Sequence, residues 1–568
     1  MISANKSKLT ARIIATALAL VSVLVFTENV TDPVNVTKLF VLGGFAFAVL
    51  GSILNSTSIS ALKRVKIPFF AAICFLLICF NVLFQSKAPF VQSFYGVYGR
   101  NNGFILYLCL TFLFVASLTL VSRNDFSYIV YALIFSGAVN VFYGFWVMAF
   151  GDPIDWNNQY GNLLGTFGNP NFIGSFFGMF SSVLFAAIFS KTTDWRWRLA
   201  ALLLLPLVFT TILETKAVQG KVLFITAAGV TLFFYVRDRF QSKYWPITYI
   251  LIAMFCFVTS IFGTLQKGPL ANLLYKESVS LRGEYWYSGW QVGVHNPWFG
   301  VGFDSLGDWY RRSRRESSLT FPGVDTVINA AHNVYLDLFA FGGWPLLASY
   351  CVITGCVITS IVKHIRNHKK FDFTFVTLLS LWTCYQLQSI ISINQVGLAI
   401  WGWVTAGLLI AYTNIVDDRE KAIGLPLRGA VSGRQATAHN EIFSPKLLAA
   451  LFAVVGMLLT VPPLSADMNW REAQLSQDVA KVESTLKPSY MNPLSSIKLI
   501  NVVGVFETNG FYDLAHKYAL KAVEFNPDSY ESWRTLSLVK NATDEDRSKA
   551  LIEMKRLDPL NPNLNRKR

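Results

Sequence analysis

Cysteine is scarce in this sequence, and none lies in the polar segments where a metal site or a disulfide-bonded outer domain would need it. All seven cysteines fall inside long apolar stretches that we predict to be membrane spans. They therefore form neither a zinc-ligand pattern nor a disulfide framework for the polar segments between the spans. We interpret them as packing residues and predict no metal site.

A nucleotide-binding loop and a removable signal peptide are also absent. The segment 296–303, NPWFGVGF, has two glycines but lacks the third glycine, the Lys-Ser/Thr pair and the preceding strand of such loops. Basic residues surround the start of the first apolar stretch, yet no small-residue cleavage site follows it. We therefore predict that this stretch is a membrane anchor that stays attached.

Long apolar runs are abundant. Hydrophobic residues make up 53% of the 568 residues, and the mean hydropathy is +0.42. A helix needs about 20 mostly apolar residues to cross the bilayer core while it satisfies its own backbone. We predict an all-α, polytopic membrane bundle of about thirteen transmembrane helices. The predicted spans are 9–27, 37–54, 67–84, 104–121, 127–150, 171–190, 198–213, 218–236, 246–264, 342–362, 373–391, 395–414 and 446–463.

The net charge of +15 reflects membrane topology rather than nucleic-acid binding. Lys and Arg gather in alternate short loops, at 63–66, 191–198, 237–243 and 363–370. The positive-inside rule makes these loops and the N-terminus cytoplasmic. The loop 151–170, which has acidic residues and no Lys or Arg, then faces outward, and an odd number of spans places the C-terminus outside as well.

We predict four regions along the chain. They are an N-terminal bundle (1–264), a large outward loop (265–333), further transmembrane helices (334–463) with a cytoplasmic linker at 415–444, and an extracytoplasmic tail (464–568). The tail contains FYDLAHKYALKAVEFNPDSYESWRTLSLV and then ALIEMKRLDPLNP, which resemble tetratricopeptide helical hairpins. A module that binds a protein partner and a bare helical cap fit this pattern equally well.

The outward loop carries the polar residues that suggest chemistry. Arg282, Trp286 and Trp290 recur every four residues and so lie on one helix face, which an ordinary interfacial helix also explains. A run of arginines that includes Arg311 follows; a solvated loop or an anion site would account for it. His332 and Asn333 then precede an apolar helix, where an imidazole can accept a proton from a hydroxyl. Asp337, five residues later, is a rival base, and a purely structural role is the alternative for His332.

The order of these motifs resembles the O-antigen ligase and polymerase superfamily. The motifs are Arg-x-x-x-Trp, Pro-x-x-Gly-x-Gly, His-Asn and a Gly-Gly turn, preceded by YGVYGRNNG at 95–103 and GTFGNPNFIGSFF at 165–177. The resemblance covers most of residues 30–415. It implies a GT-C type glycosyltransferase of the bacterial plasma membrane that uses an undecaprenyl pyrophosphate-linked glycan. It implies neither cofactor nor metal, which agrees with the lack of an Asp-x-Asp motif in the outward loops between the predicted spans.

The resemblance also assigns residues to roles. His332 matches the family's essential histidine, Arg282 the arginine that opens the large outer loop, and Arg100 that of the early loop. Where many members have a Ser-Arg pair, this chain has ETKAVQGK at 214–221, with Lys216 or Gln219 in that place. We predict that His332 and Arg282 are catalytic. The predicted pyrophosphate- and glycan-binding residues are Arg100, Lys216, Asn333 and Arg311.

Several functions remain open within and beyond this family. The acceptor is a lipid (as in lipopolysaccharide ligation), another glycan, or a protein, so that ligase, polymerase and protein O-oligosaccharyltransferase share the motifs; we favour the ligase. A lipid-linked glycan flippase is the alternative of another class. It would show internal halves and ionisable residues at the bilayer midplane, whereas the distinctive polar residues here gather at the outer face.

Overall fold

The computed structural model describes residues 2–156, 158, 161–240, 244–264, 267–268, 271, 277–424 and 444–564. Within them the chain is helical, with a single isolated bridge between Ser489 and Asn492 as the extended pairing. Parts of the predicted loops 151–170 and 265–333 and most of the linker 415–444 lie outside the described residues. The all-α polytopic architecture is confirmed.

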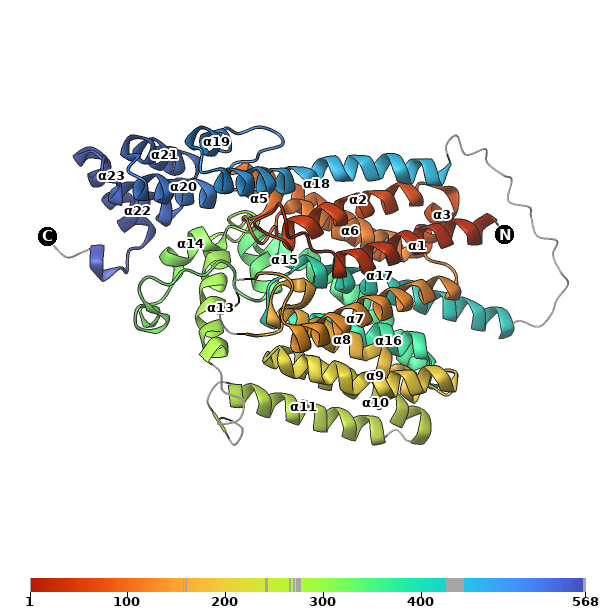
Figure 1. Ribbon diagram of the computed structural model, residues 1–568. Coiled ribbons are helices and arrows are strands. Elements are labelled where there is room, and N and C mark those ends of the chain that lie inside the picture. The colour runs from red at the N-terminus through yellow and green to blue at the C-terminus, as the bar shows by residue number, and fades with distance from the viewer. Residues whose placement is uncertain are drawn as a thin grey trace.

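The helices form a long bundle with a smaller group of helices at one end (Figure 1). The bundle helices are α1 (Ile2–Val23), α2 (Asn35–Ile53), α3 (Ser56–Arg64), α4 (Lys66–Gln85), α5 (Phe90–Tyr95), α6 (Phe104–Leu118), α7 (Arg123–Phe150), α8 (Pro170–Phe189), α9 (Trp195–Glu214), α10 (Val218–Phe240), α11 (Tyr244–Thr264), α15 (Val334–Asn367), α16 (Phe373–Ile391), α17 (Val396–Gly424) and α18 (Pro445–Ser476). Those at its end are α13 (Glu277–His295), α14 (Leu306–Ser313), α19 (Val479–Ser484), α20 (Ser496–Thr508), α21 (Tyr512–Phe525), α22 (Tyr530–Leu538) and α23 (Asp544–Leu557).

Each of the thirteen predicted spans coincides with a helix. Within the described residues, nine helices are long and apolar enough to cross a membrane; the other four spans fall on α1, α6, α11 and α16. Helix α6 has only 15 residues, and α16 carries polar side chains along its second half, such as Gln386 and Gln388. Burial does not follow this division, because the described part of α17 is fully buried in its apolar window whereas α9 is 22% buried. Hydropathy therefore identifies candidate spans without separating lipid-facing helices from those that the bundle encloses.

The last bundle helix, α18, packs against α2, near the start of the chain. A Cβ atom at Gly456 would lie 2.2 Å from the carbonyl oxygen of Gly43, and one at Gly51 would lie 2.5 Å from that of Leu448. Small residues allow this close approach of backbones, which is how many membrane helices associate. The contact brings the tail, which continues from α18, to the end of the bundle opposite the N-terminus (Figure 1).

Helix α15 is broken at Gly342 and Gly343. In an unbroken helix the N–H groups of residues 344 and 345 would donate to the carbonyls of Ala340 and Phe341. Here Trp344 N donates to Pro297 O at 2.7 Å, and Pro345 has no N–H. The two vacant carbonyls accept from Val301 N at 2.9 Å and Gly302 N at 3.0 Å.

The Pro-x-x-Gly-x-Gly segment is therefore bonded directly to the Gly-Gly turn. Gly343 has a φ of +65°, and a Cβ there would lie 2.2 Å from Pro297 O. Gly300 has a φ of +60°, and its Cβ would lie 2.3 Å from Phe341 C. Only glycine has both the required backbone angle and the required space at these positions.

The tail forms a compact helical unit with its own core. Helix α20 packs against α21, and α22 against α23, around buried residues that include Leu499, Ala519, Trp533 and Leu557. The structure ends α21 before Asn-Pro-Asp (526–528) and α23 before Asp-Pro (558–559), as the sequence predicts. The assignment of these hairpins to the tetratricopeptide family stays a prediction.

Candidate functional site

His332 lines a pocket of about 210 Å³ at the same end of the bundle as α13 and α14. Its other lining residues come from four separate stretches of the chain: Arg100, Tyr285, Val327, Ile328, Asn329 and Ile393. The early loop, α13, the segment before α15 and the turn before α17 therefore converge here. Two of the predicted site residues, Arg100 and His332, lie together in this pocket.

The backbone around His332 is fixed from both sides. His332 has a φ of +52°, an uncommon conformation for a residue other than glycine and one that often marks functional sites. On one side, Ala331 N donates to the buried Asp337 Oδ1 at 2.7 Å. On the other, Asn333 caps α15, because its Oδ1 accepts from Tyr335 N at 3.0 Å and Leu336 N at 3.2 Å.

These contacts define the roles of two neighbouring residues. The side-chain oxygen of Asn333 is committed to the helix cap, so its predicted substrate contact would rest on its amide nitrogen. Asp337, which lies five residues after His332, is 1% exposed and holds the turn instead of lining the pocket. His332 is therefore the better placed of the two potential bases.

The imidazole of His332 is held neutral by its surroundings. Burial, and then the positive charges of Arg282 and Arg100, lower its pKa from 6.5 to about 4. Its ring stacks on that of Tyr285, with 5.6 Å between centroids. At neutral pH the ring thus has a free lone pair on one nitrogen, which is what a proton acceptor requires.

Arg100 reaches the pocket as one half of an ion pair. Its guanidinium lies 2.8 Å from Asp304 Oδ1, and the Asp304 side chain is 1% exposed. Asp304 Oδ2 also accepts from Val97 N at 2.7 Å. Burial raises the pKa of Asp304, and the charge of Arg100 opposes that rise. Asp304 therefore fixes the loop of Arg100 and pairs with its charge.

Arg282 lies on α13 one turn before Tyr285 and acts on His332 through its charge. Burial lowers the pKa of its guanidinium. Among the described residues no carboxylate forms an ion pair with Arg282, whereas Glu284, two positions later, is bound by Arg315 at 2.6 Å. Arg282 therefore contributes a positive charge beside His332 that no described acid balances.

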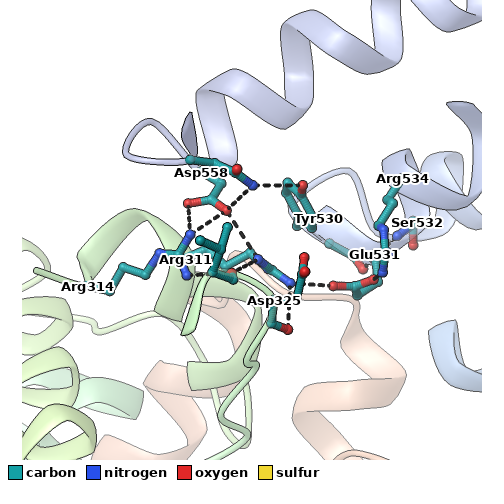
Figure 2. A network of polar contacts seen from close by, with 11 residues as sticks. Arg311, Arg314, Asp325, Tyr530, Glu531, Ser532, Arg534 and Asp558 are labelled. Atoms are coloured by element: carbon teal, nitrogen blue, oxygen red, sulfur yellow. Dashed lines mark hydrogen bonds and ion pairs between the residues drawn. The ribbon is translucent and has the colours of Figure 1, made fainter. Parts of the chain in front are cut away.

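The structure places two of the predicted ligands elsewhere. Arg311 is 3% exposed and donates to Glu531 Oε1 at 2.9 Å and to Asp558 Oδ2 at 3.2 Å, both in the tail (Figure 2). A guanidinium with these partners is occupied, so we leave Arg311 out of the proposed site. Lys216 lies in the turn after α9 with an exposed side chain and does not line the pocket.

Tyr285 and Ile393 line the pocket without having been singled out from the sequence. Tyr285 stacks on His332, and Ile393 belongs to the turn SINQ, 392–395, whose members Asn394 and Gln395 are each 3% exposed. Asn101 and Asn102 have buried side-chain oxygens without a partner in the described chain. The sequence signal for the turn 392–395 was its polar residues between two apolar spans. Buried polar groups are costly unless they are hydrogen-bonded, so such residues indicate a bonding role or a site.

The fold and this pocket define a polytopic helical membrane protein with a cationic, histidine-containing site at one end of its bundle. Residues 201–351 match the family model described as O-Antigen ligase. The predicted resemblance to that family is confirmed over this stretch, which contains Lys216, Arg282, Arg311, His332 and Asn333. The match supports a membrane glycosyltransferase of the O-antigen ligase kind. No curated protein matches the chain.

Proposed function

We propose that this protein transfers a glycan from undecaprenyl pyrophosphate to an acceptor hydroxyl at the outer face of the bacterial plasma membrane. One observation carries the proposal: a pocket with a neutral imidazole at its wall lies within the field of two guanidinium groups. An imidazole that accepts a proton and cations that bind a pyrophosphate are the two chemical functions that this reaction needs.

In the proposed reaction the acceptor oxygen attacks the anomeric carbon of the donor, with inversion. The new glycosidic C–O bond forms as the bond between that carbon and the pyrophosphate oxygen breaks, and the electron pair leaves with undecaprenyl pyrophosphate. The acceptor proton goes to His332. Negative charge that grows on the departing phosphate is stabilised by Arg282, with Arg100 in a supporting role.

The low pKa of His332 fits this scheme once the donor is considered. A base with a pKa of about 4 is weak, but two of the three causes of that value are positive charges. The pyrophosphate would bring negative charge to the same place and reverse their effect. We propose that donor binding raises the pKa of His332 and so makes it an effective base only in the loaded site.

The first test replaces the proposed base. His332→Ala should lower turnover by about 10²- to 10⁴-fold, measured as transfer from purified undecaprenyl pyrophosphate-linked glycan to a defined acceptor in liposomes. The matched control is His295→Ala, because His295 is exposed at the end of α13 and bonds only Gln291 O among the described residues. Transfer by the His332→Ala protein at the wild-type rate would remove His332 from the reaction.

The second test concerns the pyrophosphate. Arg282→Lys keeps the charge but loses the planar fork that matches two phosphate oxygens, so carrier affinity and turnover should both fall. Arg315→Lys is the control, since Arg315 carries the same group in the same loop but is bound to Glu284. An Arg282→Lys protein with unchanged affinity and rate would show that Arg282 only anchors α13.

The family model supports a glycosyltransferase of the O-antigen ligase kind in general, and within that kind we propose ligation ahead of polymerisation or transfer to protein. A deletion strain separates these products. Loss of a ligase should leave full-length carrier-linked polymer, and loss of a polymerase single carrier-linked repeat units. Carrier movement across liposomes without formation of a glycosidic bond would instead point to a flippase.

A further inference from the structure

Helix α14 and the tail meet through a cluster of buried charges that the proposed reaction does not use. Both oxygens of Asp558, in the Asp-Pro ending after α23, accept from Arg314 Nη2 at 2.8 Å. Asp558 Oδ2 also accepts from Arg311 Nη1 at 3.2 Å. The side chains of Arg314 and Asp558 are completely buried, and Figure 2 shows the three groups together with Glu531.

The same two arginines hold the segment that leads to His332. Arg311 Nη1 donates to the carbonyl of Val324 at 3.0 Å, and Arg314 Nη1 donates to that carbonyl at 2.8 Å. Arg311 Nη2 also lies 3.4 Å from the carbonyl oxygen of Asp325. Each guanidinium thus binds the tail carboxylate and the loop backbone at once.

From Val324 the chain runs directly into the pocket. Residues 327–329 line it, and His332 follows them. The far end of this segment is fixed separately, because Ala331 N donates to Asp337. The segment 324–332 therefore has two described anchor points, one provided by α15 and the other by Asp558 through Arg311 and Arg314.

We propose that Asp558 is a positioning residue for His332: a carboxylate at the C-terminal end of the tail orients two arginines whose bonds set the course of segment 324–332. This inference rests on the proposed function of His332. Without the carboxylate, the buried guanidinium of Arg314 would have no described acid to balance it, and Arg311 would keep only the partly exposed Glu531. The two like charges would then repel each other and turn away from Val324. The tail then serves the site as a brace, besides any partner that it binds.

The variant Asp558→Asn tests this role in the full-length protein, since it removes the charge and keeps the size of the side chain. We expect kcat to fall by about 10²-fold, the effect of a misplacement of about 1 Å, while KM for the donor changes by less than about threefold, because Arg282 and Arg100 are unaffected. His332 should also react faster with diethyl pyrocarbonate, as measured by mass spectrometry of its peptide.

The matched control is Asp528→Asn. Asp528 is also in the tail and pairs with Arg312 of α14 at 3.0 Å, but Arg312 donates to Asp308 and Asp528 and not to Val324 in the described structure. The Asp528→Asn variant should keep kcat and the reactivity of His332 within about twofold of wild type, because the loss of a partly exposed ion pair has a small effect. Equal effects of the two variants would mean that docking of the tail in general matters, and would overturn the specific role of Asp558.

Three further outcomes are decisive. Asp558→Asn with wild-type kcat and wild-type His332 reactivity would overturn the inference. If Asp558→Asn does not accumulate in the membrane, Arg314→Lys replaces it. Lysine retains the charge but lacks the two separate amino groups with which Arg314 holds Val324 and Asp558. A wild-type kcat in Arg314→Lys would also overturn the inference. Should the wild-type protein transfer no glycan, the proposed function fails, and the reactivity of His332 still tests the positioning.

Discussion

The pKa of His332 gives the most direct test of the proposed electrostatics. The shift from 6.5 to about 4 corresponds to about 3 kcal/mol of preference for the neutral ring, at 1.36 kcal/mol for each pKa unit. Burial is the largest cause, followed by Arg282 and then Arg100. At pH 7 about one molecule in a thousand would carry a protonated His332.

The perturbations remove or neutralise one cause at a time. Arg282→Met should raise the pKa of His332 by about 1, because the charge is the second cause and burial remains. Undecaprenyl pyrophosphate should raise it in the wild-type protein, and should do so less in Arg282→Met. Unfolding in urea should restore a value of about 6.5.

The assay is the pH dependence of carbethoxylation of His332, since diethyl pyrocarbonate reacts with the neutral ring. The resting protein should show an inflection near pH 4. The unfolded chain binds a proton at His332 more readily than the folded protein does, so this group makes the free energy of unfolding rise with pH between about 4 and 6.5. An inflection at 6.5 or above in the resting protein, or one that falls when the carrier binds, would refute the reasoning.

Three other substitutions have defined outcomes. Gly343→Ala should lower the thermal midpoint in detergent by several degrees, at a cost of about 1–3 kcal/mol, because its φ is +65° and the new Cβ would lie 2.2 Å from Pro297 O; an unchanged midpoint would contradict this. Asp337→Asn should keep most turnover, since the amide oxygen can still accept from Ala331 N, while Asp337→Ala should not; equal loss in both would make Asp337 the base. Lys216→Met should raise KM for the donor by less than about fivefold, the scale of an exposed charge, and a larger rise would place Lys216 at the pyrophosphate.

The helices could be predicted from the sequence because lipid imposes a simple rule on it. A chain that crosses hydrocarbon must satisfy its backbone within each segment, so thirteen apolar runs became thirteen helices. His332 and Arg100 could be placed near one another because motifs in separate outer loops resemble one family. The glycine motifs were visible too, but not that Gly300 and Gly343 pack against the same break in α15.

The role of the arginine run could not be read from its own neighbourhood. Four arginines in a polar loop look solvated or anion-binding when their partners are unknown. The partners of Arg311 and Arg314 are about 245 residues later, in a tail whose contact with the loop depends on tertiary packing. A salt bridge between residues so far apart leaves no local sequence pattern, so the partners of these arginines could not be predicted from the sequence.

The charges around the site explain why catalysis would wait for the donor. Arg100 is balanced by Asp304, and Arg311 and Arg314 share Asp558. Arg282 is left as the cation near His332 that no described acid balances, and after burial, the largest cause, its charge lowers the pKa of the imidazole further. Only a ligand with its own negative charge reverses that effect. In the proposed reaction, the negative charge of the pyrophosphate would raise the pKa of His332 and strengthen it as a base, so activation of the acceptor hydroxyl would depend on the bound donor.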